Sequence, residues 1–336
     1  MTGRPSKNRT LSPFPILASS PRIVALAAAR PENAAGLGKN SRVMPDLGGP
    51  SSAAYEDFLV VLARQRSGTT ALRSVLKTHP EIHCFSEILN AKLRNSSRPA
   101  LRRQSYFRWL TDKARRDPEV VLPARQEELL FEYLDHLRAL ARAPVKVVDV
   151  KYNTAHLITL PYQRLGTFAL FDLFREREMR VLNLVRRNYL RSYLSLTRAQ
   201  ASGVFGTRGD QLPGEAPVRL EVGALLWTLE RDRQEDAIVD HAFSGYEAFL
   251  RCEYAEVFPV QGTADPAALQ RIADWLGLEP SFGVEPKTSK LTALPLWEAI
   301  ENWDEVEEAL RGTRFAYCLA DEPSYYLPLL PEANAE

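Results

Sequence analysis

Mainly apolar runs of strand length, the first of them unbroken, alternate along the chain with longer segments in which apolar residues recur at helical spacing. The apolar runs begin at Phe58, Val145, Val181 and Ala248. Strands that are apolar on both faces are typical of a parallel sheet covered on both sides. This order predicts an α/β fold with a doubly wound, mainly parallel sheet and helices on both faces. No repeat is apparent in the sequence.

A long block between the first two of these runs, Leu89–Ala143, is helical in pattern and contains two amphipathic stretches, residues 102–117 and 127–142. Insertions that follow a strand lie over the edge of the sheet where ligands bind. We therefore expect a helical insertion, about 89–143, over the ligand edge. Several aromatic residues of this block and of the segment after the second run could stack on a sugar or a phenol, but such spacing is more typical of a core, so they are left out of the predicted site: Tyr106, Phe107, Trp109, Tyr152, His156 and Tyr162.

Two later segments complete the pattern. Residues Val222–Val239 are predicted to form a helix that packs against the sheet. Residues Ser202–Pro217 contain four glycines and two prolines, which is typical of a mobile lid.

The first apolar run, Phe58–Ala63, leads into a turn that suits an anion. Two cations flank the turn, Arg64 and Arg66, and four small or polar residues open the next helix: Ser67, Gly68, Thr69 and Thr70. Free N–H groups at a helix start, hydroxyl donors and guanidinium groups all favour a phosphate, and the glycine permits close approach. The alternative is an ordinary turn in which Ser and Thr cap the helix.

This turn departs from a Walker A loop, which needs two glycines and a Lys directly before the Ser or Thr that serves magnesium. Here a single glycine follows Ser67, and the cation precedes it. The sequence therefore predicts a nucleotide that is bound without a metal, with a side-chain cation neutralising its charge.

A second apolar run, Val181–Val185, also enters a helix through cations. Along that helix Arg187, Arg191 and Ser195 follow one another at four-residue steps and form one row. Two guanidinium groups and a hydroxyl suit a second phosphate. The alternative is a solvated basic face, although the neighbours of the row are apolar: Tyr189, Leu190, Tyr193, Leu194 and Leu196.

Together these motifs resemble those of sulfotransferases that use 3'-phosphoadenosine 5'-phosphosulfate (PAPS). In that family a loop of the form K/R-S-G-T-T holds the 5'-phosphosulfate, and it is matched here by Arg66, Ser67, Gly68, Thr69 and Thr70. An Arg followed eight residues later by a Ser holds the 3'-phosphate, and is matched by Arg187 and Ser195. The resemblance implies a P-loop-like fold, PAPS as co-substrate, adenosine 3',5'-bisphosphate as product, and no metal.

The resemblance extends over most of Phe58–Leu319. Residues Arg186–Ala199 match RRxxxRxxxSLxRA, the signature of bacterial carbohydrate sulfotransferases of the trehalose and Nod-factor type, and this adds Arg191 to the donor-binding residues. Residues Arg66–Glu87 are also similar to the opening of tyrosylprotein sulfotransferases. Residues Phe249–Val257 resemble the late R-Y-E-D-L strand, with Cys252 and Tyr254 as departures, and Lys287–Tyr317 resembles the end of the Nod-factor group.

The base that this resemblance implies is Glu87, which would accept the proton of an acceptor hydroxyl during in-line transfer. Without the resemblance, Glu87 fits a first-turn charge in a helix capped by Ser86. Because the cytosolic sulfotransferases use His as base, His83 and His79 compete for this role, in that order.

Two cations complete the predicted catalytic set. We expect Arg66 to stabilise the leaving phosphate, although Arg offers a planar fork where many relatives have Lys. Lys151 ends the strand that begins at Val145, and a doubly wound sheet would bring it to the same edge. The alternative for Lys151 is a strand-end surface lysine.

Composition agrees with one enzyme domain, about residues 55–330. Near-balanced charge, 43 basic against 42 acidic residues, argues against nucleic-acid binding. The three cysteines, Cys84, Cys252 and Cys318, are too far apart to suggest disulfides or zinc, so we expect a reducing, cytoplasmic location.

Residues 1–54 differ in kind, because they are rich in Pro, Ala, Ser and Gly and carry more cations than acids. Their longest apolar stretch, Ile23–Ala29, is too short to span a bilayer. We predict a disordered extension, or translation that begins at Met44, and no stable membrane anchor. An organelle transit peptide is the alternative.

The acceptor is expected to be a small molecule, carbohydrate or glycolipid, since no motif encodes the choice. The oligomeric state stays open, with a homodimer as one option. Two other functions remain: a metal-dependent small-molecule kinase, with Asp149 as magnesium ligand, and a non-catalytic nucleotide-binding protein. The loop argues against the first, and the presence of Glu87 with Arg66 argues against the second.

Overall fold

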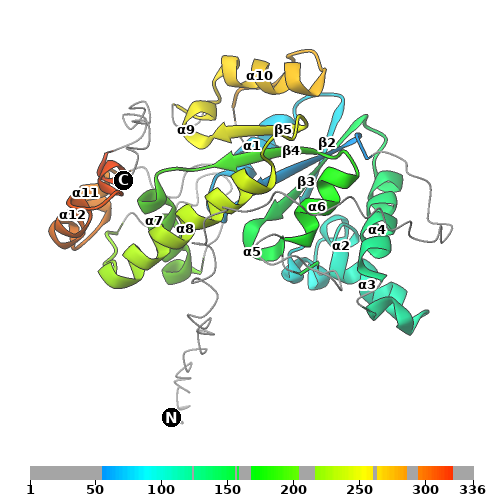
Figure 1. Cartoon of the computed structure of the whole chain (residues 1–336), viewed down its shortest axis with the longest axis horizontal. Coiled ribbons are helices and arrows are strands. Elements are labelled where there is room, and N and C mark those ends of the chain that lie inside the picture. The colour runs from blue at the N-terminus through cyan, green and yellow to red at the C-terminus, as the bar shows by residue number, and fades with distance from the viewer. Residues whose placement is uncertain are drawn as a thin grey trace, which may run out of the picture. The chain divides into compact units, whose positions relative to one another are not determined.

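A five-stranded sheet lies at the centre of the fold in a computed structural model of the chain, which describes residues 55–122, 125–155, 157–158, 168–203, 216–259, 263–285 and 294–320. All strand pairs are parallel, and the order is β2-β3-β1-β4-β5 (Figure 1). The strands are β1 Phe58–Ala63, β2 Ile82–Glu87, β3 Val145–Lys151, β4 Arg180–Val185 and β5 Phe249–Glu253. The prediction of a doubly wound parallel sheet is confirmed.

Helices connect these strands and cover the sheet. The α-helices are α1 Thr69–Leu76, α2 Pro99–Arg103, α3 Tyr106–Ala114, α4 Gln126–Leu140, α5 Tyr152–Ala155, α6 Ala169–Glu176, α7 Tyr189–Ser202, α8 Val222–Ala242, α9 Tyr254–Val257, α10 Pro266–Leu276, α11 Leu296–Ala299 and α12 Trp303–Arg311. Short 3-10 turns are η2 Ala91–Asn95, η3 Pro118–Val121 and η5 Ala316–Leu319.

The two faces of β1 bury different sets of helices. Val60 and Leu62 pack in one core with residues of α4, α6 and the end of α8. Leu59 and Val61 pack in a second core with α1 and α10. Because side chains alternate along a strand, the unbroken apolar run Phe58–Ala63 is what permits both cores to form.

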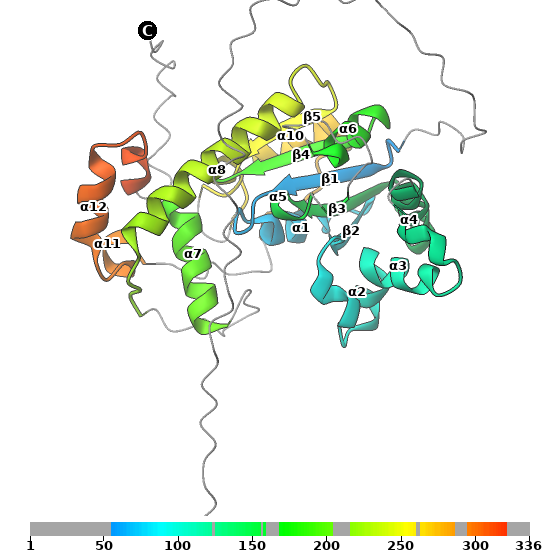
Figure 2. The same cartoon turned by 60° about the horizontal axis from the view of Figure 1, so that its bottom comes forward.

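A third core lies beyond the carboxyl edge of the sheet. It joins α7 to the first half of α8 and to α12, through residues such as Leu194, Leu225 and Val306. The predicted helix Val222–Val239 therefore packs against the sheet only near its end. Figure 2 shows the strands running toward the side of the fold where α7 lies.

The predicted helical insertion is confirmed as α2, α3 and α4. It begins at the carboxyl edge of the sheet, where the Tyr106 N–H donates to the Ile88 carbonyl at 3.1 Å. It then returns along one face, and Arg138 of α4 pairs at 2.8 Å with Asp57, next to the amino end of β1. Only its first part therefore lies beside the ligand edge.

Two predictions fall outside the described residues: the N-terminal extension, and residues 204–215 of the predicted lid. Within the described part of the chain, no helix combines the length and the apolar composition that crossing a bilayer requires.

Candidate functional site

The loop after β1 has an unusual backbone. Arg66 and Gly68 both have positive φ angles, 68° and 89°. Gly68 is the N-cap of α1, and no side chain caps this helix. The capping alternative for the loop hydroxyls is therefore wrong, and the Thr69 hydroxyl instead accepts a hydrogen bond from the Lys151 ammonium.

An aromatic ring covers the glycine of this loop. A Cβ on Gly68 would lie 2.3 Å from Cε2 of Tyr254, which is far inside contact distance. The same ring also contacts Arg186, whose guanidinium carbon lies 4.8 Å from the ring centroid, and Phe258, whose ring centroid lies 5.3 Å away. Only glycine fits at position 68, because it meets both the steric and the backbone requirement.

Arg66 joins the two predicted phosphate motifs. Its Nε donates to Oγ of Ser195 at 3.0 Å, across 129 residues of sequence. Burial lowers the pKa of Arg66, Arg186 lowers it further, and Glu87 raises it. A lowered guanidinium pKa means that the surroundings disfavour positive charge, so a bound anion would stabilise the loop.

Lys151 is buried at the carboxyl edge of the sheet, beside the loop that follows β1. It is 4% exposed, its Nζ lies 2.8 Å from Oδ1 of Asp149, and it lies 4.0 Å from Oε1 of Glu87. The surface-lysine alternative is therefore wrong. Asp149, which is fully buried, also pairs at 3.2 Å with Nε of Arg73. Two cations thus neutralise the carboxylate that a kinase would need for magnesium.

Glu87 ends β2, so it is not a first-turn charge in a helix. The residue that caps the following turn is Asn90, whose side chain accepts from the Lys92 N–H and donates to Oε2 of Glu87 at 2.9 Å. The Glu87 side chain is 34% exposed. It therefore lies beside a buried cation and remains reachable by a substrate.

The two histidines lie elsewhere. The register of β2 with β3 pairs His83 with Lys146 and Glu87 with Asp149, so His83 lies about three residues, roughly 10 Å, toward the amino ends of the strands. His79 is buried, with Nδ1 accepting from the Glu81 N–H at 3.1 Å and Nε2 donating to the Glu279 carbonyl at 2.8 Å. Both ring nitrogens of His79 are thus engaged in structure.

The predicted row is only partly helical, because Arg191 and Ser195 lie on α7 whereas Arg187 precedes its N-cap, Asn188. Ser195 reaches the loop after β1, as described. The Arg187 backbone N–H donates to Glu253 at 2.9 Å, and its Nε lies 3.8 Å from the same carboxylate. Nη1 of Arg191 donates to the Leu294 carbonyl at 2.9 Å. The row therefore bridges β1, β5 and the C-terminal segment.

Arg64 does not belong to the phosphate loop. It is buried, its Nη2 lies 2.7 Å from Asp236, and its Nη1 lies 3.1 Å from Asp232 on α8. The interpretation of Arg64 as a cation for the anion is therefore wrong. A buried guanidinium needs carboxylate partners, and α8 supplies two of them at a four-residue spacing.

The sequence reasoning missed the positions of three residues in this candidate site: Asp149 beside Lys151, Glu253 beside Arg187, and Tyr254 over Gly68. Glu253 and Tyr254 stand at the end of a strand and at the residue after it. The rule that ligand residues gather at the carboxyl ends of parallel strands could have found both.

No protein-family model matches the chain, and no curated protein matches it significantly. The solved structures to which the chain is similar include the following three. The sulfotransferase domain of the Synechococcus PCC 7002 olefin synthase has 17% identity over 74% of this chain and 82% of that domain, with a TM-score of 0.35.

The second structure, a sulfotransferase from Alicyclobacillus acidocaldarius, has 13% identity over 81% of this chain and 99% of that one, with a TM-score of 0.38. The third, mouse sulfotransferase SULT7A1 complexed with PAP, has 13% identity over 80% and 89%, with a TM-score of 0.39. Identities and TM-scores this low do not by themselves assign a function.

Proposed function

We propose that this chain is a PAPS-dependent sulfotransferase that acts in the cytoplasm on a hydroxyl of a small-molecule, carbohydrate or glycolipid acceptor. The observation that carries the proposal is the hydrogen bond from Arg66 to Ser195. It joins a loop suited to a 5'-phosphosulfate to a helix suited to a 3'-phosphate. A nucleotide with phosphates on both sides of its ribose fits this pair of motifs.

The donor would be held by the two motifs together. The N–H groups and hydroxyls of Ser67–Thr70 would contact its 5' end, at the positive end of the α1 dipole. The 3'-phosphate would lie near Ser195 and the guanidinium groups of Arg187 and Arg191. The lowered pKa of Arg66 supports an anion at this place.

In the transfer, the acceptor oxygen forms a bond to sulfur while the bond from sulfur to the phosphate oxygen breaks. The acceptor proton passes to Glu87, and the electron pair of the broken bond stays on the phosphate of adenosine 3',5'-bisphosphate. Arg66 and Lys151 would stabilise the charge that develops there. The 4.0 Å separation between Lys151 and Glu87 supports a shared reaction centre.

Thermal unfolding with different nucleotides tests this proposal. Adenosine 3',5'-bisphosphate should raise the melting temperature without magnesium, by the equivalent of about 2.7 kcal/mol at a hundredfold excess over its Kd. ATP should do so far less. A preference for ATP that requires magnesium would support the kinase instead, against the position of Asp149 between Lys151 and Arg73.

The role of Glu87 is tested by Glu87→Gln. The Gln side chain keeps an oxygen that can accept the hydrogen bond from Asn90, so binding of the nucleotide should persist. Turnover should fall by about a hundredfold or more, because the general base has been removed. Radiolabelled sulfonate transfer measures turnover, and calorimetry measures donor binding.

Glu81→Gln is the matched control, since Glu81 is exposed before β2. Normal turnover in Glu87→Gln would remove Glu87 from the mechanism. Donor binding without turnover in the wild type, across a broad set of hydroxylated acceptors, would favour the non-catalytic alternative.

A further inference from the structure

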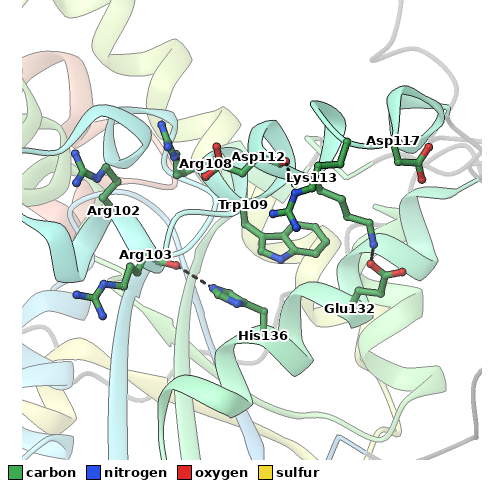
Figure 3. A pocket seen from close by; sticks show the side chains of 10 residues that line it. Arg102, Arg103, Arg108, Trp109, Asp112, Lys113, Asp117, Glu132 and His136 are labelled. Carbon is green, nitrogen blue, oxygen red and sulfur yellow. Dashed lines mark hydrogen bonds and ion pairs between the residues drawn. The ribbon is translucent and has the colours of Figure 1, made fainter.

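The helical insertion contains a cleft of about 700 Å³ between α2, α3 and α4. Figure 3 shows the indole of Trp109 in its middle, with Arg102 and Arg103 toward one end and the Lys113–Glu132 pair toward the other. The volume lies within the range of about 300–1,000 Å³ that is usual for ligand pockets.

Trp109 has a fixed position in this cleft. Its ring stacks on Tyr106 with centroids 6.1 Å apart and lies 5.5 Å from the ring of Tyr133. It remains only partly buried, unlike these two tyrosines, which are core residues. The Lys113 ammonium also lies over this indole, 5.4 Å from the ring centroid, so a sugar that stacks on the partly exposed ring would share it with this cation.

Positive charge prevails along this cleft. Its three acids pair with cations from the same helices or from just before α4: Asp112 with Arg108, Glu132 with Lys113, and Asp117 with Arg125. Among the residues that the structure describes, the guanidinium groups of Arg102, Arg103 and Arg116 have no carboxylate partner.

The excess of basic residues also extends along the sequence toward Glu87, the predicted base. Between Glu87 and Asp112 the sequence contains no acid, but it contains Lys92, Arg94, Arg98, Arg102, Arg103 and Arg108. Single basic residues are usually just solvated. Here three of them, Arg102, Arg103 and Arg108, line the cleft that contains Trp109.

The cationic end of the cleft is bonded to the strand that carries Glu87. The Ser86 N–H donates to Oε1 of Gln104 at 3.0 Å, and the Ile88 carbonyl accepts from the Tyr106 N–H at 3.1 Å. These two bonds flank Glu87 on both sides. The turn between α2 and α3 is therefore fixed against the proposed transfer site.

We propose that this cleft binds the acceptor, and that the acceptor is an anionic carbohydrate: a sugar that already bears a carboxylate, phosphate or sulfate. The sugar ring would stack on Trp109, its anionic groups would pair with Arg102 and Arg103, and one hydroxyl would face Glu87. The acceptor role rests on the proposed function, whereas binding of an anionic sugar does not.

Calorimetry with short dextran sulfate, and with unsulfated dextran of the same length, tests the site. Wild type should bind the sulfated chain and not the neutral one, with an affinity that falls as salt rises. The double variant Arg102→Gln/Arg103→Gln should weaken this binding roughly tenfold, since each exposed charge pair contributes a few-fold. In Trp109→Phe, the change in tryptophan fluorescence on binding should disappear.

The matched control is Lys77→Gln/Arg142→Gln, which removes two exposed cations from other elements and should leave dextran sulfate binding unchanged. The melting shift with adenosine 3',5'-bisphosphate should be the same in both double variants. If that shift is absent in wild type while glycan binding depends on Arg102 and Arg103, the donor assignment fails and the glycan site stands.

Three outcomes would overturn the proposal: equal binding of sulfated and neutral dextran, no effect of the Arg102 and Arg103 changes, or equal loss in the control variant. Binding to phosphatidylglycerol vesicles without binding to dextran sulfate would also overturn it, and would assign the cationic surface to a membrane.

Discussion

Gly68 satisfies two independent requirements at one position. Its φ of 89° lies in the left-handed region, where a side chain costs about 1–2 kcal/mol. Its missing Cβ also leaves room for the ring of Tyr254. The loop can therefore keep its N–H groups directed outward while an aromatic side chain closes over it.

Gly68→Ala should destabilise the loop and weaken binding of adenosine 3',5'-bisphosphate by about tenfold or more, because both the backbone and the ring of Tyr254 must shift. Calorimetry and thermal unfolding measure the two effects. Gly277→Ala is the control, since Gly277 has a φ of 70° but no atom near its Cβ position. Its cost should be confined to stability, and equal donor affinity in both variants would contradict the steric argument.

Single-residue roles were predictable only where the partner is close in sequence or lies at the same strand end. Arg66 and Arg64 look alike in the sequence, yet Arg66 bonds to Ser195 and Arg64 is buried against Asp236. The partner of each arginine lies more than a hundred residues away. Spacing along the chain could not separate a ligand-binding cation from a structural one.

Helix α7 carries the second half of the proposed donor site. Its start is fixed by Asn188, which caps it and donates to the carbonyls of Cys318 and Ala320. The Tyr317 hydroxyl donates to the Arg187 carbonyl at 3.2 Å. The segment around η5 therefore positions the helix that brings Ser195 to Arg66.

Ser195→Ala should weaken donor binding by about fivefold to tenfold, which corresponds to the roughly 1 kcal/mol net worth of one hydrogen bond. The melting temperature of the free protein should change little. Thr197→Ala is the control on the same helix, because the Thr197 hydroxyl donates to the Tyr193 carbonyl of its own helix and, within the described residues, makes no hydrogen bond to the loop after β1. Wild-type donor affinity in Ser195→Ala would remove Ser195 from the site.

The three strands inside the sheet and the edge strand β5 were predicted from their apolar runs, but the other edge strand, β2, was not. The runs from Phe58, Val145 and Val181 lie inside the sheet and are buried on both faces. The edge strand β2 has only two fully buried residues, Ile82 and Phe85, so its pattern hardly differs from that of a turn. This explains why Glu87 also fitted a helix start.

A buried acidic cluster links the sheet to α8 and affects the stability of the whole fold. Burial, with the carboxylate of Asp232 next to it, raises the pKa of Glu235 to about 7, while Arg231 and Arg64 lower it. A carboxyl whose pKa is raised on folding binds more protons in the folded state. The free energy of unfolding should therefore fall as pH rises from about 4.5 to about 7.

Glu235→Gln should remove this fall, which is up to about 3 kcal/mol for a shift of this size. Urea unfolding measured at several pH values across the window tests it. The exposed Glu308, changed to Gln, is the control and should retain the pH dependence of wild type. An unchanged slope in Glu235→Gln would assign the pH dependence to other groups.

The architecture of the domain followed from the order of strands and helices, because connection rules leave few topologies for such an order. The path of the helical insertion across the sheet could not be predicted in this way. Helical periodicity shows which face of α4 is apolar. It does not show the ion pair between Arg138 and Asp57 or the hydrogen bond between Ser86 and Gln104, because these partners lie far apart in the sequence. The cationic cleft of the insertion was invisible for the same reason.

The strand order places β1 between β3 and β4. On one side of β1 lies β4, which is followed by the residues that would bind the 3'-phosphate. On the other side lie β3 and then β2, which ends at Glu87 and is followed by the insertion. The segment between β2 and β3 could therefore be replaced while the proposed 3'-phosphate residues after β4 stay in place. A chimaera with a foreign insertion should inherit a new acceptor range and keep its original donor.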